Sequence, residues 1–245
     1  RDGWWNRTEE AAAGHTGLWL TLAVAAALGL RSAAAGRNFL HPDEVMHFMA
    51  AAEPTLRSTL DAARVHAHPP LYLVALHFWM VFGDSEWWLR MLSAVAGAAA
   101  LAVLCLTVRN LFGGAAAILV AGFGATNGFL IGIGAEVRQY ALMHLGVACA
   151  FYFQERYFRS AARRDLGLSV AGICLGVATH YSALFAVPAL GAAALVQAAQ
   201  SGEPRRRLTP WITLHLATVA LIVFLYVTHL SQFRGSLTEQ LAQGG

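Results

Sequence analysis

The chain has 245 residues, of which 57% are hydrophobic and only 13% are charged. A soluble domain carries about 25% charged residues, so the composition excludes an ordinary soluble protein and indicates a polytopic membrane protein. All 17 basic residues are arginines, which together with the abundant alanine favours a GC-rich bacterial genome. The net charge of +3 comes from short arginine clusters between apolar segments, so we expect no nucleic-acid partner.

Apolar segments predict an all-α transmembrane bundle of seven spans, because about 20 apolar residues cross a bilayer as a helix. The first span, at about 17–35, lacks a cleavage signal and is retained. A long loop follows over about 36–86. The later spans are predicted at about 87–108, 115–135, 139–158, 166–180, 181–199 and 210–230, and another loop starts over 231–245. We interpret residues 1–245 as a single module from the N-terminal part of a longer protein.

Arginine placement orients these spans, since basic residues concentrate on the cytoplasmic side. Three clusters, at Arg109, at Arg156 to Arg164 and at Arg205 to Arg207, share one side if the N-terminus is cytoplasmic. The loop over 36–86 then lies on the outer side. Within it, Leu71–Phe82 is too short to span the membrane and is predicted to lie along its surface.

Two adjacent carboxylates, Asp43 and Glu44, follow the first span directly. Pro42 precedes them, and proline followed by acidic residues is typical of an ordinary helix start. Ionisable groups beside a span also mark functional sites. Taken alone, the pair fits a helix start and a catalytic centre equally well.

Three further polar clusters are predicted on the outer side. His66 and His68 precede two prolines. Together with His41, His47 and the two carboxylates, they leave a bound divalent cation as an open alternative, although their spacing fits no defined metal motif. Glu136 and Arg138 lie between two spans, where they pair with each other or face an outer cavity. The fourth cluster, His180-Tyr181, is either a tight turn or part of the same cavity.

The order of these motifs resembles the GT-C membrane glycosyltransferases, in particular the protein O-mannosyltransferase and aminoarabinose transferase branch. The resemblance rests on Asp43-Glu44, His68-Pro69-Pro70-Leu71, Trp88 to Ala94, Ala135 to Leu142 and Thr179-His180-Tyr181. Many bacterial members carry Gln-Glu-Ala-Arg-x-Tyr-Ala-Leu. Here Ala135 and Val137 replace the family's glutamine and alanine, whereas the acid, arginine and tyrosine are kept.

The resemblance implies an inverting transfer of a sugar from a polyprenyl-phosphate donor in the membrane to an acceptor hydroxyl of a glycan, lipid or protein. Asp43 is the implied general base, and Glu44 is the second predicted catalytic residue. Arg138 is the implied partner of the leaving phosphate. The other implied substrate-binding residues are His68, Glu136, Tyr140, His180 and Tyr181. The expected location is the bacterial inner membrane, with the active face periplasmic.

A second hypothesis is a non-catalytic membrane subunit that keeps this scaffold and packs against membrane-protein partners. Its basis is the glycine-rich stretch from Gly122 to Gly134, because small residues favour close helix packing in membranes. A transporter is a weaker third hypothesis, since the spans carry few ionisable residues and no clear inverted repeat.

Overall fold

Helix α2 (Thr16–Ala35) is the first element of the computed structural model, which describes residues 14–231. The described residues form helices and loops without a strand, so the predicted all-α membrane bundle is confirmed. The bundle comprises α2, α6 (Glu86–Phe112), α7 (Gly114–Thr126), α8 (Gly128–Ile133), α9 (Tyr140–Ser160), α10 (Arg163–Thr179), α11 (Ala186–Gln200) and α12 (Pro204–Leu225). A 3-10 turn, η2 (Tyr181–Phe185), precedes α11, and a π-helical turn, η3 (Tyr226–Leu230), extends α12.

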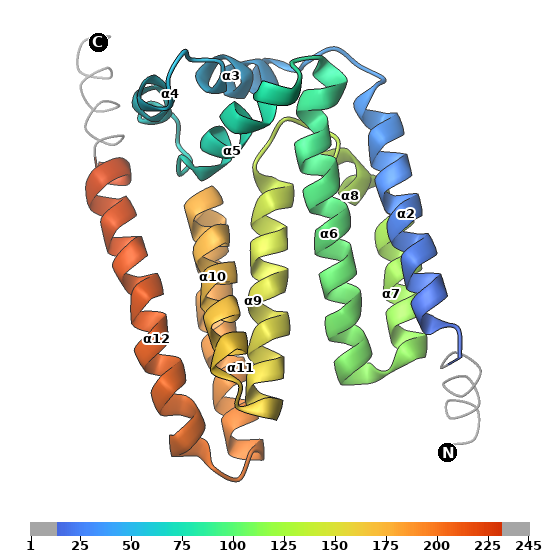
Figure 1. The fold of residues 1–245 in the computed structure, drawn as a ribbon, viewed down its shortest axis with the longest axis vertical. Helices are drawn as coiled ribbons and strands as arrows, with labels where there is room; N and C mark the ends of the chain where they lie inside the picture. The colour runs from blue at the N-terminus through green and yellow to red at the C-terminus, as the bar shows by residue number, and fades with distance from the viewer. Residues whose placement is uncertain (1–13, 232–245) are drawn as a thin grey trace, which may run out of the picture.

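Three short helices lie across one end of the bundle (Figure 1). They are α3 (Pro42–Ala51), α4 (Leu56–Ala63) and α5 (Leu71–Trp79), which the 3-10 turn η1 (Met80–Phe82) extends. We call this layer, residues 42–82, the cap. Tyr72, Leu73 and Leu76 of α5 are buried in a cluster with residues of α3, α4 and α6, so the cap packs on the bundle through α5.

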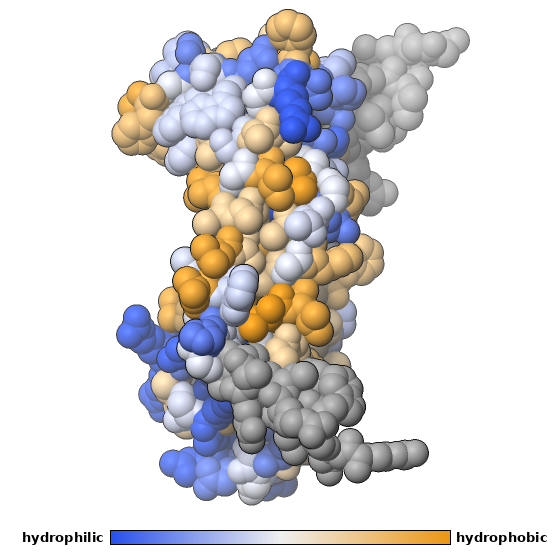
Figure 2. All heavy atoms as spheres, turned by 90° about the vertical axis from the view of Figure 1, so that its right-hand side faces the viewer, coloured by the Kyte–Doolittle hydropathy of each residue, from blue (hydrophilic) through white to orange (hydrophobic). Residues whose placement is uncertain are grey.

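Four described segments are long and apolar enough to cross a bilayer: α2, α6, Tyr181–Gln200 and Pro204–Leu230. Helices α7, α9 and α10 run beside them (Figure 1). Seen from the α2 side, a hydrophobic band lies between two hydrophilic ends (Figure 2). This is the surface expected of a protein whose middle contacts lipid. The chain is therefore a multi-pass membrane protein, while the seven-span module stays a prediction.

Two predicted spans differ from the observed helices. The span at 115–135 is not one helix, because the backbone turns at Asn127 and its side chain accepts a hydrogen bond from the Leu130 N–H, starting α8 afresh. The span at 210–230 begins earlier, since α12 starts at Pro204, and a proline fits the first turn of a helix. Residues 232–245 of the predicted final loop lie outside the described residues.

Glycines bring α9 and α10 into close contact. A Cβ atom at Gly146 would lie 2.6 Å from the backbone nitrogen of Gly176 and 2.7 Å from the carbonyl oxygen of Gly172. Real Cβ atoms do not approach backbone atoms this closely, so glycine is required for the observed spacing. Close backbone approach through small residues is the usual way in which helices associate in a membrane.

Candidate active site at the cap

Glu44 is a buried carboxylate at the start of α3. Its Oε1 accepts hydrogen bonds from Arg90 Nε and the Val137 N–H, each at 2.8 Å. Its Oε2 accepts from Arg90 Nη2 and the His41 N–H, also at 2.8 Å. Burial opposes ionisation of Glu44, but these hydrogen bonds outweigh it, so its pKa lies below the ordinary value. Glu44 thus joins α3, α6 and the turn before α9.

Arg90 uses all five of its N–H groups. Besides Glu44, it donates to the carbonyl oxygens of Ala35 at 2.8 Å, Asn38 at 2.7 Å and Phe39 at 3.0 Å. These carbonyls belong to the end of α2 and the connection to α3. Only an arginine presents five donors in a fixed fork, so this side chain fixes how the chain leaves the bundle and enters the cap.

Asp43 lies beside Glu44 in sequence but in a different environment. Half of its side chain is exposed, and its Oδ2 lies 3.2 Å from Arg138 Nη1. The Arg138 guanidinium lies over the ring of Tyr140, 5.1 Å from its centroid, and donates to the Tyr140 hydroxyl at 3.3 Å. Ser93 of α6 donates to the Arg138 carbonyl oxygen at 3.0 Å and so holds the backbone of this turn.

Two cavities meet at Arg138. The larger, of about 750 Å³, lies between the end of α2, the start of α3 and the turn at 132–138, and we call it the cap cavity. Glu44, Arg90 and Glu136 also line it. Glu136 and Arg138 therefore line the same cavity.

The smaller cavity, of about 280 Å³, lies on the other side of Arg138 and is called the histidine cavity. Asp43, His66 and His68 line it together with Arg138. Arg138, the predicted phosphate partner, thus lines both cavities, whereas Asp43, the predicted base, lines only the histidine cavity. This arrangement gives a carboxylate and a guanidinium simultaneous access to bound molecules.

Imidazole rings continue the wall of the histidine cavity. The ring of His68 stacks on that of His180 at 4.7 Å between centroids, and Tyr140 lies 5.2 Å from His180. Burial, with help from His180, His47, Arg138 and His66, lowers the pKa of His68 to about 4. Burial also lowers the pKa of His66 and of His180. These rings are neutral near pH 7 and offer hydrogen bonds without adding charge.

Tyr181 points elsewhere. Its hydroxyl lies 2.9 Å from His229 Nδ1, and His229 Nε2 lies 3.0 Å from the carbonyl oxygen of Ala63. Because the carbonyl can only accept, we assign the His229 proton to Nε2 and the Tyr181 hydroxyl as donor to Nδ1. These contacts join the end of α12 to α4 of the cap, and they separate Tyr181 from the other predicted site residues.

Within residues 14–231, no group of three or more His, Cys, Asp or Glu side chains is arranged to hold a metal ion. The divalent cation left open by the sequence stays a prediction. Sequence reasoning assigned no role to Arg90, although it lies in the Trp88 to Ala94 stretch and an arginine inside the predicted span 87–108 was a signal. Ser93, one helical turn later in the same stretch, was given no role either.

The family model described as dolichyl-phosphate-mannose-protein mannosyltransferase matches residues 67–229. The chain belongs to this family. The mannosyltransferase family is one of membrane glycosyltransferases of the GT-C type that use a lipid-linked sugar, in agreement with the resemblance drawn from the motifs. The matched segment includes His68, Arg138 and His180 and begins after Asp43 and Glu44. No curated protein and no solved structure matches the chain.

Proposed function

We propose that the chain transfers a sugar from a polyprenyl-phosphate donor to an acceptor hydroxyl, with inversion, at the cap side of the membrane. The observation that carries this proposal is the contrast between two adjacent carboxylates. Glu44 is 2% exposed and bonded on both oxygens, whereas Asp43 faces a cavity beside Arg138. A general base needs this accessibility, because it must come within about 3 Å of the proton it removes.

The reaction follows from the placement of these groups. Asp43 takes the proton of the acceptor hydroxyl while the hydroxyl oxygen attacks the anomeric carbon. The bond from that carbon to the phosphate oxygen breaks on the opposite face, and the lipid phosphate leaves with the bonding electrons. Arg138 lines both cavities, so its guanidinium is positioned to stabilise the charge that grows on the phosphate.

The remaining predicted residues take supporting roles in this proposal. Glu44 is a positioning residue, because it holds the start of α3 and thereby the direction of Asp43. Tyr140 holds the Arg138 guanidinium over its ring. Glu136, which lines the cap cavity, orients the sugar hydroxyls. His68 and His180 supply neutral hydrogen-bonding groups at the acceptor side.

The proposed setting follows the family. Its description names a mannose carried on dolichyl phosphate and a protein acceptor, and we carry over only the class of donor, a sugar on a long-chain lipid phosphate. The cap side is the periplasmic side of a bacterial inner membrane in this proposal, because the three arginine clusters lie at the other end of the spans.

The test is sugar transfer by the purified full-length protein, supplied with a radiolabelled polyprenyl-phosphate sugar and membrane extract as acceptor. We expect Asp43→Asn to lower the transfer rate by about 10²–10⁴-fold, the usual contribution of general acid–base catalysis. Asp61→Asn is the matched control, because Asp61 is a similarly exposed carboxylate of the cap that pairs with Arg64. It should keep the wild-type rate.

Full activity in Asp43→Asn would remove Asp43 as the base. The anomeric configuration of the product, read from the one-bond carbon–proton coupling constant at its anomeric carbon, separately tests inversion. If the wild-type protein neither binds the donor nor transfers its sugar, and co-purifies with membrane-protein partners, the non-catalytic subunit hypothesis replaces the enzyme.

A further inference from the structure

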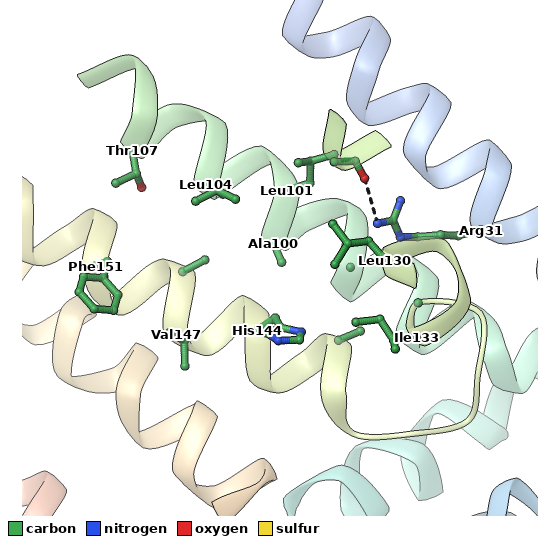
Figure 3. Close-up of a pocket in the computed structure, with 15 residues that line it drawn as sticks. Arg31, Ala100, Leu101, Leu104, Thr107, Leu130, Ile133, His144, Val147 and Phe151 are labelled. Atoms are coloured by element: carbon green, nitrogen blue, oxygen red, sulfur yellow. Dashed lines mark hydrogen bonds between the residues drawn. The ribbon is translucent and has the colours of Figure 1, made fainter. Parts of the chain in front are cut away.

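A third cavity, which is apolar, lies inside the bundle, away from the cap. It has a volume of about 380 Å³ and is enclosed by α2, α6, α7, α8 and α9. Figure 3 shows Arg31 and Ile133 at one end, with Thr107 and Phe151 toward the other. Leu104 and Val147 lie between them. We call this space the bundle cavity.

Arg31 is a buried cation without a counter-charge among residues 14–231. Its side chain is 2% exposed, and it donates only to the carbonyl oxygens of Ala27 at 3.0 Å and Gly124 at 3.5 Å. Its Nε is buried and has no hydrogen-bond partner. A guanidinium has five N–H groups, so three of them remain available. A buried charge in a membrane is costly unless it is paired.

Two glycines leave the space that the Arg31 side chain occupies. A Cβ atom at Gly134 would lie 2.6 Å from Arg31 Nε, and one at Gly97 would lie 3.1 Å from it. Both glycines also line the bundle cavity. The guanidinium is therefore held at a fixed place at the end of the cavity, where an anion would complete its hydrogen bonds.

The length of the cavity matches one leaflet of a bilayer. Arg31 is four residues before the cap end of α2, so it lies about 6 Å below that end at 1.5 Å per residue. The lining residues of α6 run from Gly97 to Thr107, a distance of about 15 Å along the helix. This is half of the roughly 30 Å hydrocarbon core, the depth that one acyl chain occupies.

The bundle cavity is also distinct from the proposed catalytic cavities. The cap cavity is lined by Arg90 and Arg138 but not by Arg31, and the bundle cavity is lined by Arg31 but by neither of the other two. A donor with one phosphate placed beside Asp43 cannot also neutralise Arg31. An anion other than the donor phosphate is therefore needed to neutralise Arg31.

We propose that the bundle cavity binds one acyl chain of an anionic phospholipid from the leaflet on the cap side, whose phosphate pairs with Arg31. The lipid completes the bundle: it fills the space between α6 and α9 and neutralises the cation next to the turn at 132–135. Since that turn leads into Glu136 and Arg138, the bound lipid supports the wall of the cap cavity from below.

The test counts bound lipids by native mass spectrometry on the detergent-solubilised full-length protein, using phosphatidylglycerol and phosphatidylcholine as probes. We expect one phosphatidylglycerol per chain, held at least tenfold more tightly than phosphatidylcholine. Arg31→Met should lower the affinity for phosphatidylglycerol at least tenfold. Ala148→Phe should do the same by filling the cavity that Ala148 lines, and it keeps the test valid if Arg31→Met does not fold.

Ala192→Phe is the matched control, because it makes the same substitution at an exposed position of α11 outside this cavity. It should bind phosphatidylglycerol as the wild type does. Equal affinity for the two phospholipids, or unchanged binding in Ala148→Phe, would overturn the proposal. So would displacement of phosphatidylglycerol by a polyprenyl phosphate, which would assign the cavity to the sugar carrier. The readout is binding, so it is independent of whether sugar transfer is found.

Discussion

Asp43 and Glu44 carry the same chemical group but have different environments, because they point in different directions from the start of α3. Adjacent helical residues point about 100° apart, so Asp43 faces the histidine cavity while Glu44 faces the bundle. Arg90 is the residue that decides this. It neutralises Glu44 and ties the carbonyls after α2 to the same point. A buried ion pair therefore contributes to the junction between cap and bundle, alongside the packing of α5.

We expect Glu44→Gln to lower the free energy of unfolding by about 3–5 kcal/mol, the usual cost of breaking a buried ion pair from one side. The substitution keeps the shape of the side chain but leaves the Arg90 charge uncompensated at 4% exposure. Equilibrium unfolding of the detergent-solubilised protein measures it.

Glu203→Gln is the control for this change. Glu203 pairs with Arg206 at 3.0 Å, but both side chains are largely exposed, and exposed pairs contribute about 0–1 kcal/mol. If both substitutions cost the same, the ion pair of Glu44 and Arg90 does not stabilise the junction between cap and bundle.

At the scale of elements, close contact between α9 and α10 holds the centre of the bundle. The same two helices carry the site at their cap ends, since α9 begins at Tyr140 and α10 ends just before His180. Their separation therefore sets the distance between the Tyr140 and His180 rings. A wider helix pair would also shift His180 relative to His68, which lines the histidine cavity.

We expect Gly146→Ala to destabilise the protein and to weaken sugar transfer, because the new methyl group meets backbone atoms of α10 that cannot move alone. Overpacking of this kind costs about 1–3 kcal/mol. Gly191→Ala is the matched control, since nothing lies within 4 Å of its Cβ position. Alanine is the better helix former by about 1 kcal/mol, so the control should unfold at the same or a higher temperature. Equal stability of the two variants would contradict the close contact.

At the scale of the whole molecule, the histidine cluster is built from parts far apart in sequence. His47 belongs to α3, His68 to the loop before α5, and His180 to the turn after α10. Burial disfavours the charged form of His68 and of His180, and the nearby charge of Arg138 adds to this effect. Folding thus creates a group of imidazoles that resists protonation.

This predicts that acid destabilises the protein. The pKa of His68 is about 4 in the folded chain and about 6.5 when unfolded, so the unfolded state binds more protons between these values. Stability therefore falls as pH drops through this window and is unaffected above it. The pKa of Glu44 is lowered, so its contribution is lost only at more acidic pH.

The measurement is the unfolding temperature from pH 7.5 to 4.5. We expect His68→Asn to flatten its dependence on pH, because asparagine does not titrate. His15→Asn replaces an exposed histidine at the start of α2 and should keep the wild-type dependence. A slope that is the same in His68→Asn and the wild type would contradict a buried neutral His68.

The class of fold and the family could be predicted from the sequence, because the length of hydrophobic segments and the order of motifs are local properties of the chain. The spans at 17–35, 87–108 and 139–158 correspond to α2, α6 and α9 to within a few residues. The break at Asn127 was not foreseen, since a polar residue inside an apolar run starts a new helix only when the turn is accommodated by its neighbours.

The contacts between polar side chains that are distant in sequence depend on the tertiary structure. Asp43 and Arg138 are 95 positions apart in sequence, and no local sequence pattern predicts their contact. The same holds for Glu44 with Arg90, for Tyr181 with His229, and for Arg31 with the bundle cavity. These contacts depend on how the cap lies on the bundle and on the spacing of the helices. Both the placement of the cap and the helix spacing result from packing between residues that are distant in sequence.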